Sequence, residues 1–243
     1  MSEAWPVHRM GIIDSTNTEA KRRVASGFQD QWIVADQQTA GRGRQDREWI
    51  SPAGNVYATA LFREPGGLPV ALRLPFAAAL AVTDVVLEHA PGTDVRVKWP
   101  NDVRIDRRKV SGILVETGGG GSELWVAAGI GINLLPPPEN VTQPATSLLE
   151  LGMRPGTPVD TVLSSLRHAF ARRVTQARES FRGTRKDWLE RAEALGQVVQ
   201  VRTGDTAAEG IFEDLEDDGA LLLRLPDGTR RSIRAGEVDI RRS

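Results

Sequence analysis

The 243-residue chain contains no cysteine, only three histidines, one tyrosine, and four lysines among its 31 basic residues. The absence of cysteine excludes thiol catalysis, disulfides and cysteine-ligated zinc. The histidines His8, His89 and His168 are scattered without the spacing of metal ligands. Any bound metal is therefore expected to be Mg²⁺ on oxygen ligands.

The sequence also lacks a long uninterrupted hydrophobic run. Its most apolar stretch, residues 74–90, is broken by Pro75 and Asp84, and the N-terminus has no signal-peptide pattern. The net charge is −1, so the composition does not indicate a disordered chain or a general nucleic-acid binder. These features predict a soluble, cytoplasmic globular protein without membrane association, in which any positive site is local.

The apolar pattern predicts a mixed α and β fold. Thr16 and Glu19 resemble a capping box that starts a helix ending at Gly27, and Thr157 and Pro158 resemble a cap followed by a proline at the first helical position. The predicted strands are WIVA (32–35), VYATALF (56–62), VRVKW (95–99), KVSGILVE (109–116) and LWVAAGIGINL (124–134). The predicted helices are a buried one over 70–90, a long amphipathic one from Val159 through Phe181, and a shorter one ending near Leu195.

From residue 196 the sequence changes to short β-type segments separated by turns. These segments are VVQV, EGIFEDL, ALLLRL and RSIRAGEV, and the turns contain Gly-Asp, Asp-Asp-Gly and Pro-Asp-Gly. The pattern predicts a small all-β barrel over residues 196–243, after a larger domain of residues 1–195. Because about fifty residues bury little surface alone, we expect this unit to pack against the first domain.

The segment TAGRGRQDREW, residues 39–49, is predicted to be a loop between strands. Its glycines let the backbone approach a ligand closely, while Arg42, Arg44 and Arg47 offer donors to a phosphate or carboxylate. An anionic ligand is predicted. The alternatives are an ordinary surface loop or an RNA-binding arm, although such arms usually repeat. Asp46 and Glu48 offset part of the charge and can occupy Arg47.

The stretch KWPND, residues 98–102, places polar residues where a predicted strand ends. Asp102 can hold Mg²⁺, and Asn101 can bond a nucleotide or phosphate oxygen. The alternative is a simple Asn-Asp turn that cannot continue the strand. Lys98 and Trp99 point to opposite faces, so the lysine requires an anionic partner or exposure.

Two further strands carry unusual residues. Lys109 begins KVSGILVE, where Gly112 opens space, and a lysine in an arginine-rich chain suggests a site that requires a compact ammonium. GIGIN, residues 129–133, alternates glycine with isoleucine, so one face is bare backbone. A flat ligand or close strand packing explains that face equally well.

Common nucleotide and hydrolase motifs are absent. GIGINL lacks the third glycine of a dinucleotide fingerprint, and TGGGGS is not a P-loop. The sequence also contains no G-x-S-x-G elbow and no H-E-x-x-H helix. Any ATP must therefore be held by a different architecture.

Five ordered motifs, DSTNTEAKR, QQTAGRGRQDREWISPAGNVY, KWPNDV, RKVSGILVE and AGIGINL, resemble the biotin protein ligase (biotin–[acetyl-CoA-carboxylase] ligase) family over essentially the whole chain. The resemblance implies an α+β fold: a mixed-sheet catalytic domain of the biotin/lipoate ligase type, similar to class II aminoacyl-tRNA synthetases, with a C-terminal SH3-like barrel. Family members that also act as repressors carry an N-terminal helix-turn-helix. Only fourteen residues precede Ser15, so DNA binding is not expected.

The resemblance implies a two-step acyl transfer with biotin, ATP and Mg²⁺. The biotin carboxylate attacks the α-phosphate of ATP to give biotinyl-5′-AMP and pyrophosphate, and a lysine of a biotin carboxyl carrier protein then attacks the mixed anhydride. That carrier belongs to acetyl-CoA carboxylase or a related carboxylase. The oligomeric state stays open, and a homodimer is one option.

The resemblance also assigns site residues. Lys109 matches the lysine at the biotin carboxylate and α-phosphate, and Arg44 belongs to the loop that closes over the adenylate; these two are the expected catalytic residues. Asp102 is the expected Mg²⁺ ligand. The expected biotin-binding residues are Ser15, Thr16, Asn17, Gln38, Gly41, Arg42, Gly43, Arg44, Tyr57, Lys109, Gly112, Gly129 and Gly131. The expected ATP or adenylate contacts are Arg44, Arg47, Trp49, Asn101, Lys109 and Asn133.

Two other functions remain in view. A lipoate ligase shares the fold and the adenylate chemistry, although the combination of GRGR with KWPND fits biotin better. A biotin sensor without catalysis needs the pocket but not the charged groups, and the chain retains Arg44, Lys109 and Asp102.

Overall fold

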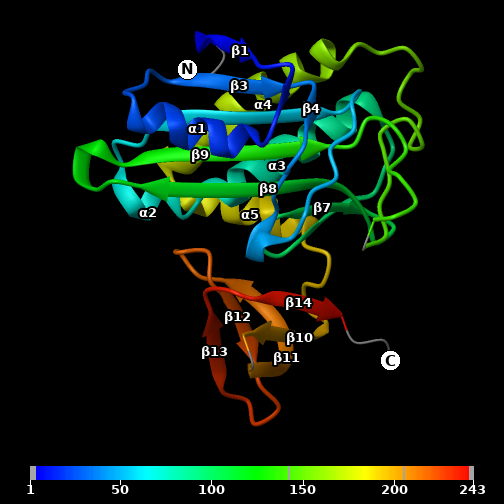
Figure 1. Cartoon of the computed structure of the whole chain (residues 1–243). Helices are drawn as coiled ribbons and strands as arrows, with labels where there is room; N and C mark the ends of the chain where they lie inside the picture. Colours follow the sequence, from blue (N-terminus) through cyan, green and yellow to red (C-terminus); the bar gives the residue numbers. More distant parts are fainter. Residues whose placement is uncertain (1–3, 142, 205, 241–243) are drawn as a thin grey trace.

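The computed structural model describes residues 4–141, 143–204 and 206–240. Its centre is a seven-stranded mixed sheet (Figure 1) in which only the β1–β3 pair is parallel. In sheet order, the strands are β1 (Val7–Arg9), β3 (Gln31–Ala35), β5 (Val56–Arg63), β9 (Trp125–Ile132), β8 (Arg108–Gly118), β7 (Asp102–Ile105) and β6 (Val95–Lys98). A short parallel pair, β2 (Ile12–Ile13) with β4 (Gln37–Gln38), lies outside this sheet.

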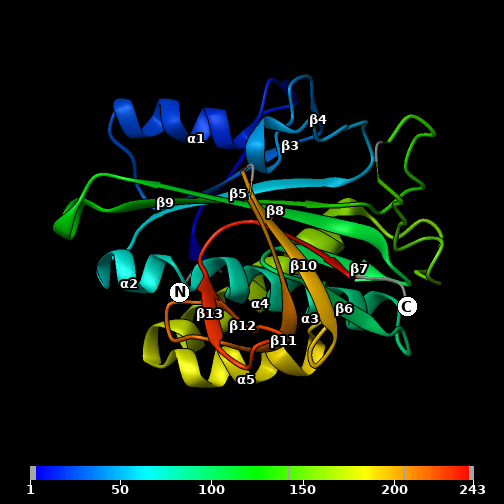
Figure 2. The same ribbon diagram turned by 90° about the horizontal axis from the view of Figure 1, so that it is seen from below.

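Helices cover both faces of the sheet. Figure 2 shows α1 (Thr16–Ala25) on one face and the remaining helices on the other. The helices of the second face are α2 (Gly67–Ala71), α3 (Leu74–His89), α4 (Val159–Glu179) and α5 (Phe181–Arg191). Two short 3₁₀ turns are η2 (Arg44–Asp46) and η3 (Gly121–Glu123).

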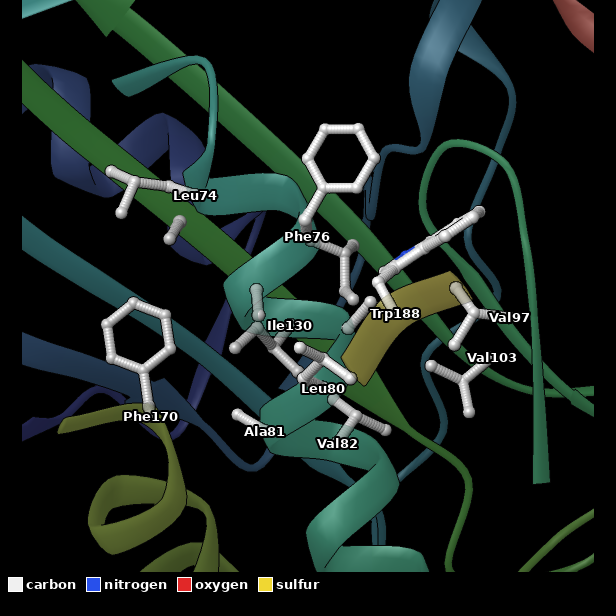
Figure 3. Close-up of a cluster of buried hydrophobic side chains, with 14 of the residues drawn as sticks. Leu74, Phe76, Leu80, Ala81, Val82, Val97, Val103, Ile130, Phe170 and Trp188 are labelled. Atoms are coloured by element: carbon white, nitrogen blue, oxygen red, sulfur yellow. The ribbon is translucent and has the colours of Figure 1, made fainter. Parts of the chain in front are cut away.

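The core lies between the sheet and α3, and Figure 3 shows part of it. Side chains such as Leu80 of α3, Ile130 of β9 and Phe170 of α4 are almost fully buried there. By length and composition, the segment Gly67–His89 could cross a membrane, but 67% of its most apolar window is buried inside the protein. The predicted buried helix is therefore confirmed as the central core helix.

The C-terminal segment forms a separate five-stranded antiparallel sheet, as predicted for an all-β unit. In chain order, its strands are β10 (Val198–Thr203), β11 (Thr206–Leu215), β12 (Leu221–Arg224), β13 (Arg230–Ile233) and β14 (Glu237–Ile240). The predicted single segment RSIRAGEV is in fact two strands, β13 and β14.

Aromatic packing joins the two sheets into one core. The ring of Trp188 on α5 lies 5.6 Å from Phe76 of α3 and 6.3 Å from Phe212 of β11, between ring centroids. The Trp99 indole donates a 3.1 Å hydrogen bond to the carbonyl oxygen of Gly219. The expectation that the small unit packs against the large one is therefore met.

The helix that begins near Thr16 does not use the predicted capping box. Its N-cap residue is Ser15, which makes no side-chain cap hydrogen bond, and Glu19 pairs with Arg23 at 3.0 Å instead of capping. The Thr16 hydroxyl is bonded to Gln38. The side chains of Thr16 and Glu19, which the sequence pattern assigned to the cap, are therefore used in contacts with Gln38 and Arg23. Gly27 follows the helix in the left-handed conformation, at φ +81°, as a terminating glycine should.

Two other predicted boundaries are wrong. The long helix ends at Glu179, because Ser180 is extended and caps a new helix that starts at Phe181. The N-cap residue of α4 is Pro158 instead of Thr157, so this helix begins one residue later than predicted. The strand β6 ends at Lys98, before the proline, as expected, but the turn after it leads into a strand that was not predicted, β7, which begins at Asp102.

Candidate functional site

A cavity of about 550 Å³ lies on the sheet face that carries α1. Every site residue expected from the sequence lines it, with the exception of Gly41. Gly41 is buried, and a Cβ there would collide with the carbonyl oxygen of Trp49. The cavity also takes Lys98 and Trp99 from the β6–β7 turn, and Gly236 from the C-terminal sheet. Motifs far apart in the sequence therefore converge on one space.

Three glycines form the floor of the cavity. Gly112 of β8 pairs with Gly131 of β9, and a Cβ on Gly131 would lie 2.6 Å from the indole nitrogen of Trp49. A Cβ on Gly129 would overlap the amide oxygen of Asn17. The bare strand face is therefore covered by the side chains of Asn17 and Trp49, which themselves line the cavity.

A chain of polar groups closes the α1 end of the cavity. The Gln38 amide oxygen accepts hydrogen bonds from the Thr16 backbone N–H at 2.9 Å and from its hydroxyl at 3.2 Å. The Gln38 amide nitrogen donates to Ser51 at 2.9 Å. The fully buried hydroxyl of Thr59 lies 2.8 Å from that of Thr16 and 2.7 Å from the amide oxygen of Asn17. Sequence patterns did not indicate Thr59 or Ser51.

Asn17 is fixed from the opposite side by β8. Its amide nitrogen donates to the Leu114 carbonyl oxygen at 3.1 Å and to the Glu116 carboxylate at 2.9 Å. Glu116 also pairs with Lys21 and Arg42. Burial alone would raise the pKa of Glu116, but the hydrogen bonds from Lys21 and Asn17 hold this pKa below its usual value. Glu116 was also missed by sequence reasoning.

A lysine–carboxylate pair lies at the other end of the cavity. The Lys109 ammonium is 2.7 Å from Asp102, and its nitrogen is 5.3 Å from the centroid of the Trp49 ring. Both charged side chains are about one-fifth exposed. Lys98, also at the cavity, has Asp239 of β14 at 3.7 Å, which supplies the anionic partner expected for it.

Two asparagines expected at the nucleotide connect segments of the wall. The Asn101 amide donates to the Ile113 carbonyl oxygen, and the Asn133 amide donates to the Thr146 carbonyl oxygen at 3.1 Å. Both residues are at least nine-tenths buried. They therefore hold the wall in shape as well as facing the cavity.

Tyr57 lines the cavity from β5. Its hydroxyl donates to the Pro52 carbonyl oxygen at 2.7 Å and accepts from the Asn55 amide at 3.1 Å. Burial raises the pKa of Tyr57 to about 12, so its hydroxyl stays protonated at neutral pH. The Asn55 oxygen in turn accepts from the backbone of Leu134 and Leu135. Asn55 is a further residue that the sequence did not single out.

The Gly–Arg loop (residues 39–49) lies over the cavity with its arginines lining it. Gly43 N–H bonds the Arg47 carbonyl oxygen at 2.7 Å, and the Arg47 Nε donates to the Arg44 carbonyl oxygen at 3.5 Å. Arg42 Nε and Trp49 Nε1 are buried without a hydrogen-bond partner. The side chain of Asp46 lies outside the described residues, so its predicted competition for Arg47 stays a prediction.

The acidic residues of the cavity suit a metal carried by a ligand better than a resident one. Within residues 4–141, 143–204 and 206–240, no cluster of three or more His, Asp or Glu is arranged to hold a metal ion. Mg²⁺ in phosphate-transfer sites typically uses one or two carboxylates together with the phosphates of the substrate. Asp102, a single carboxylate beside Lys109, fits that arrangement.

The cavity thus joins two different ends over a flat floor. Hydroxyl and amide groups lie at the α1 end, and five cations, Arg42, Arg44, Arg47, Lys98 and Lys109, face the same space. Such an arrangement suits a ligand with a neutral polar head and a strongly anionic end.

Comparisons with known proteins find similarity to biotin protein ligases over nearly the whole chain. Residues 10–133 match the model of the biotin/lipoate A/B protein ligase family, and residues 194–241 match the biotin protein ligase C-terminal domain. A biotin–[acetyl-CoA-carboxylase] ligase of Paracoccus denitrificans is 42% identical over 93% of this chain and 96% of its own length. A ligase of the same name from Mycobacterium tuberculosis is 34% identical over 92% of this chain and 85% of its own length.

The fold gives the same result. The structure of a biotin protein ligase from Aquifex aeolicus in complex with biotin and ATP superposes with a TM-score of 0.80. The two sequences are 28% identical, and the superposition covers 98% of this chain and 99% of the other.

Proposed function

Because the chain belongs to the biotin protein ligases of the biotin/lipoate A/B protein ligase family, we propose that its cavity activates biotin with ATP and transfers it to a carrier protein. The observation that carries this proposal is the convergence of the five sequence motifs on one cavity, with neutral polar groups at one end and Lys109 beside Asp102 at the other. A mixed anhydride of biotin and AMP matches that distribution of charge.

The polar end of the cavity is suited to the ureido head of biotin. A ureido group has one carbonyl acceptor and two N–H donors, and Ser15, Thr16, Asn17 and Gln38 offer both kinds of partner. The floor formed by Gly112, Gly129 and Gly131 is covered by the side chains of Trp49 and Asn17, and the flat bicyclic ring would pack against that layer. Tyr57 closes the side of this pocket.

The first step joins the biotin carboxylate to ATP. A carboxylate oxygen forms a bond to the α-phosphorus, and the bond to the bridging oxygen of pyrophosphate breaks. The ammonium of Lys109 stabilises the charge that develops on the transferring phosphate, and Arg44 and Arg47 on the loop lie at the same space. Trp49, Asn101 and Asn133 form the wall expected at the nucleotide. Mg²⁺, held by Asp102 and the phosphates, would neutralise charge on the pyrophosphate leaving group.

The second step transfers biotin to a lysine of a biotin carboxyl carrier protein. The neutral amine attacks the carbonyl carbon of the anhydride, the amide bond forms, and AMP leaves as the amine loses a proton. Arg42, Gly43 and Arg44 on the Gly–Arg loop cover the intermediate until the acceptor arrives. The acceptor class follows from the carboxylase ligases to which this chain is similar.

The wider properties of the chain are proposed on the same basis. We expect a cytoplasmic enzyme without DNA-binding activity or membrane association. Residues 1–195 would form the catalytic domain and residues 196–243 the C-terminal domain. The contact of Gly236 with the cavity gives the second domain a place at the active site.

The test is the biotin-dependent exchange of radioactive pyrophosphate into ATP in the presence of Mg²⁺ and without an acceptor. Lipoate in place of biotin is the control for the related ligase activity. An isolated biotin-accepting domain is then added, and its mass should rise by one biotin. Exchange that appears only with lipoate, or only when the acceptor is present, would contradict the proposal.

A further inference from the structure

A carboxylate just outside the cavity connects two parts of its wall. Residues alternate between faces along β8, so Gly112, Leu114 and Glu116 share the face that carries α1. Gly112 and Leu114 line the cavity, whereas Glu116 does not. The Glu116 side chain is 21% exposed, and its partners come from two segments far from it in sequence.

Three groups share the two oxygens of Glu116. Oε1 accepts from the Lys21 ammonium at 2.5 Å, and Oε2 accepts from the Asn17 amide at 2.9 Å. Nη2 of Arg42 lies 3.4 Å from each oxygen. A carboxylate has about four acceptor sites, so it can serve these donors together. A neutral amide at this place would direct its own N–H groups toward two cations.

Asn17 and Arg42 do not depend on Glu116 to the same extent. The Asn17 amide is also held by the Leu114 carbonyl oxygen and by Thr59, on two different strands. Arg42 belongs to the Gly–Arg loop, and its Nε is buried without a hydrogen-bond partner. Its contact with Glu116 ties a glycine-flanked loop to the middle of the sheet.

We infer that Glu116 is a positioning residue that anchors Arg42, and through it the Gly–Arg loop, over the bound biotin. It touches neither the substrate nor the reacting atoms, and it acts by fixing the place of Arg42. The inference rests on the proposed function, since it names the residue that holds the lid of that site. A loop that is released from β8 binds biotin more weakly, while the groups that carry out adenylation stay in place.

The kinetic test compares Glu116→Gln with Lys21→Gln as a matched control. Lys21 is a partner of the same carboxylate, but its side chain is 42% exposed and does not line the cavity. Glu116→Gln should raise the KM for biotin about tenfold, and kcat at saturating biotin should change less than about twofold. Lys21→Gln should leave both values near those of the wild type. Glu116→Asp, which keeps the charge, should recover part of the lost affinity.

A second measurement needs no activity. Trypsin cleaves after arginine, so the rate of cleavage within residues 39–49 of the substrate-free protein reports how firmly the loop is held. Cleavage after Arg44 and Arg47 should be several-fold faster in Glu116→Gln than in the wild type or Lys21→Gln. This result stands even if the protein fails to use biotin, so failure of the inference and failure of the proposed function are distinguishable.

A double-mutant cycle with Arg42→Gln tests the connection itself. In the Arg42→Gln background, Glu116→Gln should have little further effect on the KM for biotin. The inference is wrong if the two effects simply add, if Glu116→Gln lowers kcat at an unchanged KM, or if Lys21→Gln reproduces the phenotype. It is equally wrong if Glu116→Gln matches the wild type in both assays. Should Glu116→Gln fail to fold, the same comparisons are made with Glu116→Asp, whose shorter side chain should raise the KM for biotin in the same direction but to a smaller extent.

Discussion

Lys109 and Arg44 bring positive charge to the same cavity from backbones of different stiffness. Lys109 is the second residue of β8, and its backbone N–H and carbonyl both bond the segment around residue 145. Arg44 lies in a loop between Gly43 and Gln45, and Gln45 has a φ of 55°. A rigid donor can be preorganised for a developing charge, whereas a donor on a loop can open and close.

Replacing Lys109 with alanine should therefore cripple adenylate formation. Loss of one preorganised donor typically costs about 2.7–4 kcal/mol, or roughly 10²–10³ in rate. The measurement is single-turnover formation of biotinyl-AMP at saturating ATP and biotin. Arg108→Ala is the control, because that neighbouring cation pairs with Glu150 and does not line the cavity. Normal adenylation by Lys109→Ala would remove this lysine from the chemistry.

Replacing Arg44 with glycine should weaken retention of the adenylate more than its synthesis. The released anhydride is a reactive acylating agent, so the variant should label bystander proteins such as albumin that the wild type leaves unmodified. Albumin labelling and adenylate formation are measured in the same samples, with Lys109→Ala as a variant that forms adenylate slowly. Labelling no greater than that of the wild type would show that Arg44 does not retain the intermediate.

Cavity residues that stand in unusual local patterns could be predicted from the sequence, whereas ordinary polar residues inside strands could not. The glycines and arginines of residues 41–47 are unusual enough to suggest a ligand. Thr59 lies in a strand where any β-branched residue would fit, so nothing local marks its hydroxyl as a partner of Thr16. Glu116 resembles a solvated strand residue until Lys21 and Arg42 are placed beside it. Their roles depend on contacts between segments distant in sequence.

At the scale of the elements, the missed strand β7 shows the same limit. Asp102 is disfavoured in strands, and the residues before it include a proline. Pairing with β6 on one side and β8 on the other nevertheless holds Asp102–Ile105 extended. That hairpin places Asp102 beside Lys109. The strand that could not be predicted from local propensity therefore supplies the carboxylate of the charged pair. Strands with strong apolar patterns, such as β5 and β9, were predicted within about two residues.

The glycine floor makes a prediction about β9. In Gly131→Ala, the added Cβ would lie 2.6 Å from the Trp49 indole nitrogen, so Trp49 must move from its place in the cavity wall. Overpacking of this kind costs about 1–3 kcal/mol. If the ligand binds only when Trp49 returns to its original position, this cost corresponds to an affinity for the ligand that is about five- to 150-fold weaker. Calorimetric titration with biotin, with and without a non-hydrolysable ATP analogue, measures the loss.

The control for this substitution is Gly120→Ala in the β8–β9 turn. No atom lies within 4 Å of a Cβ placed there, so both affinity and melting temperature should be unchanged. A Gly131→Ala variant with normal affinity for both ligands would mean that the bare strand face is not required for binding.

For the whole molecule, the proposed boundary at residue 195 predicts what truncation does. Removal of residues 196–243 should leave the seven-stranded sheet folded, since all of its strands and helices precede the cut. The truncation exposes Trp188, Trp99 and Phe76, which now pack against the C-terminal sheet, so the melting temperature should fall by several degrees. Adenylation should be impaired because Gly236 no longer borders the cavity.

Far-ultraviolet circular dichroism and the pyrophosphate exchange assay measure the two effects of truncation. As a control, the separately expressed segment 196–243 is added to the truncated protein, to test whether contact alone restores adenylation. An insoluble or unfolded fragment 1–195 would show that the two sheets are one folding unit, and the proposed division would be wrong.

The almost wholly buried helix α3 imposes an order of events during synthesis on the ribosome. It packs against α4, α5, β8 and β9, and all four are translated after it. Arg191, the last residue of α5, follows His89 by 102 residues. At elongation rates of about 5–20 residues per second, α3 waits about 5 to 20 seconds for α5. The nascent chain therefore presents a membrane-like apolar segment to chaperones throughout that interval, and the yield of soluble protein should rise when elongation is fast relative to aggregation.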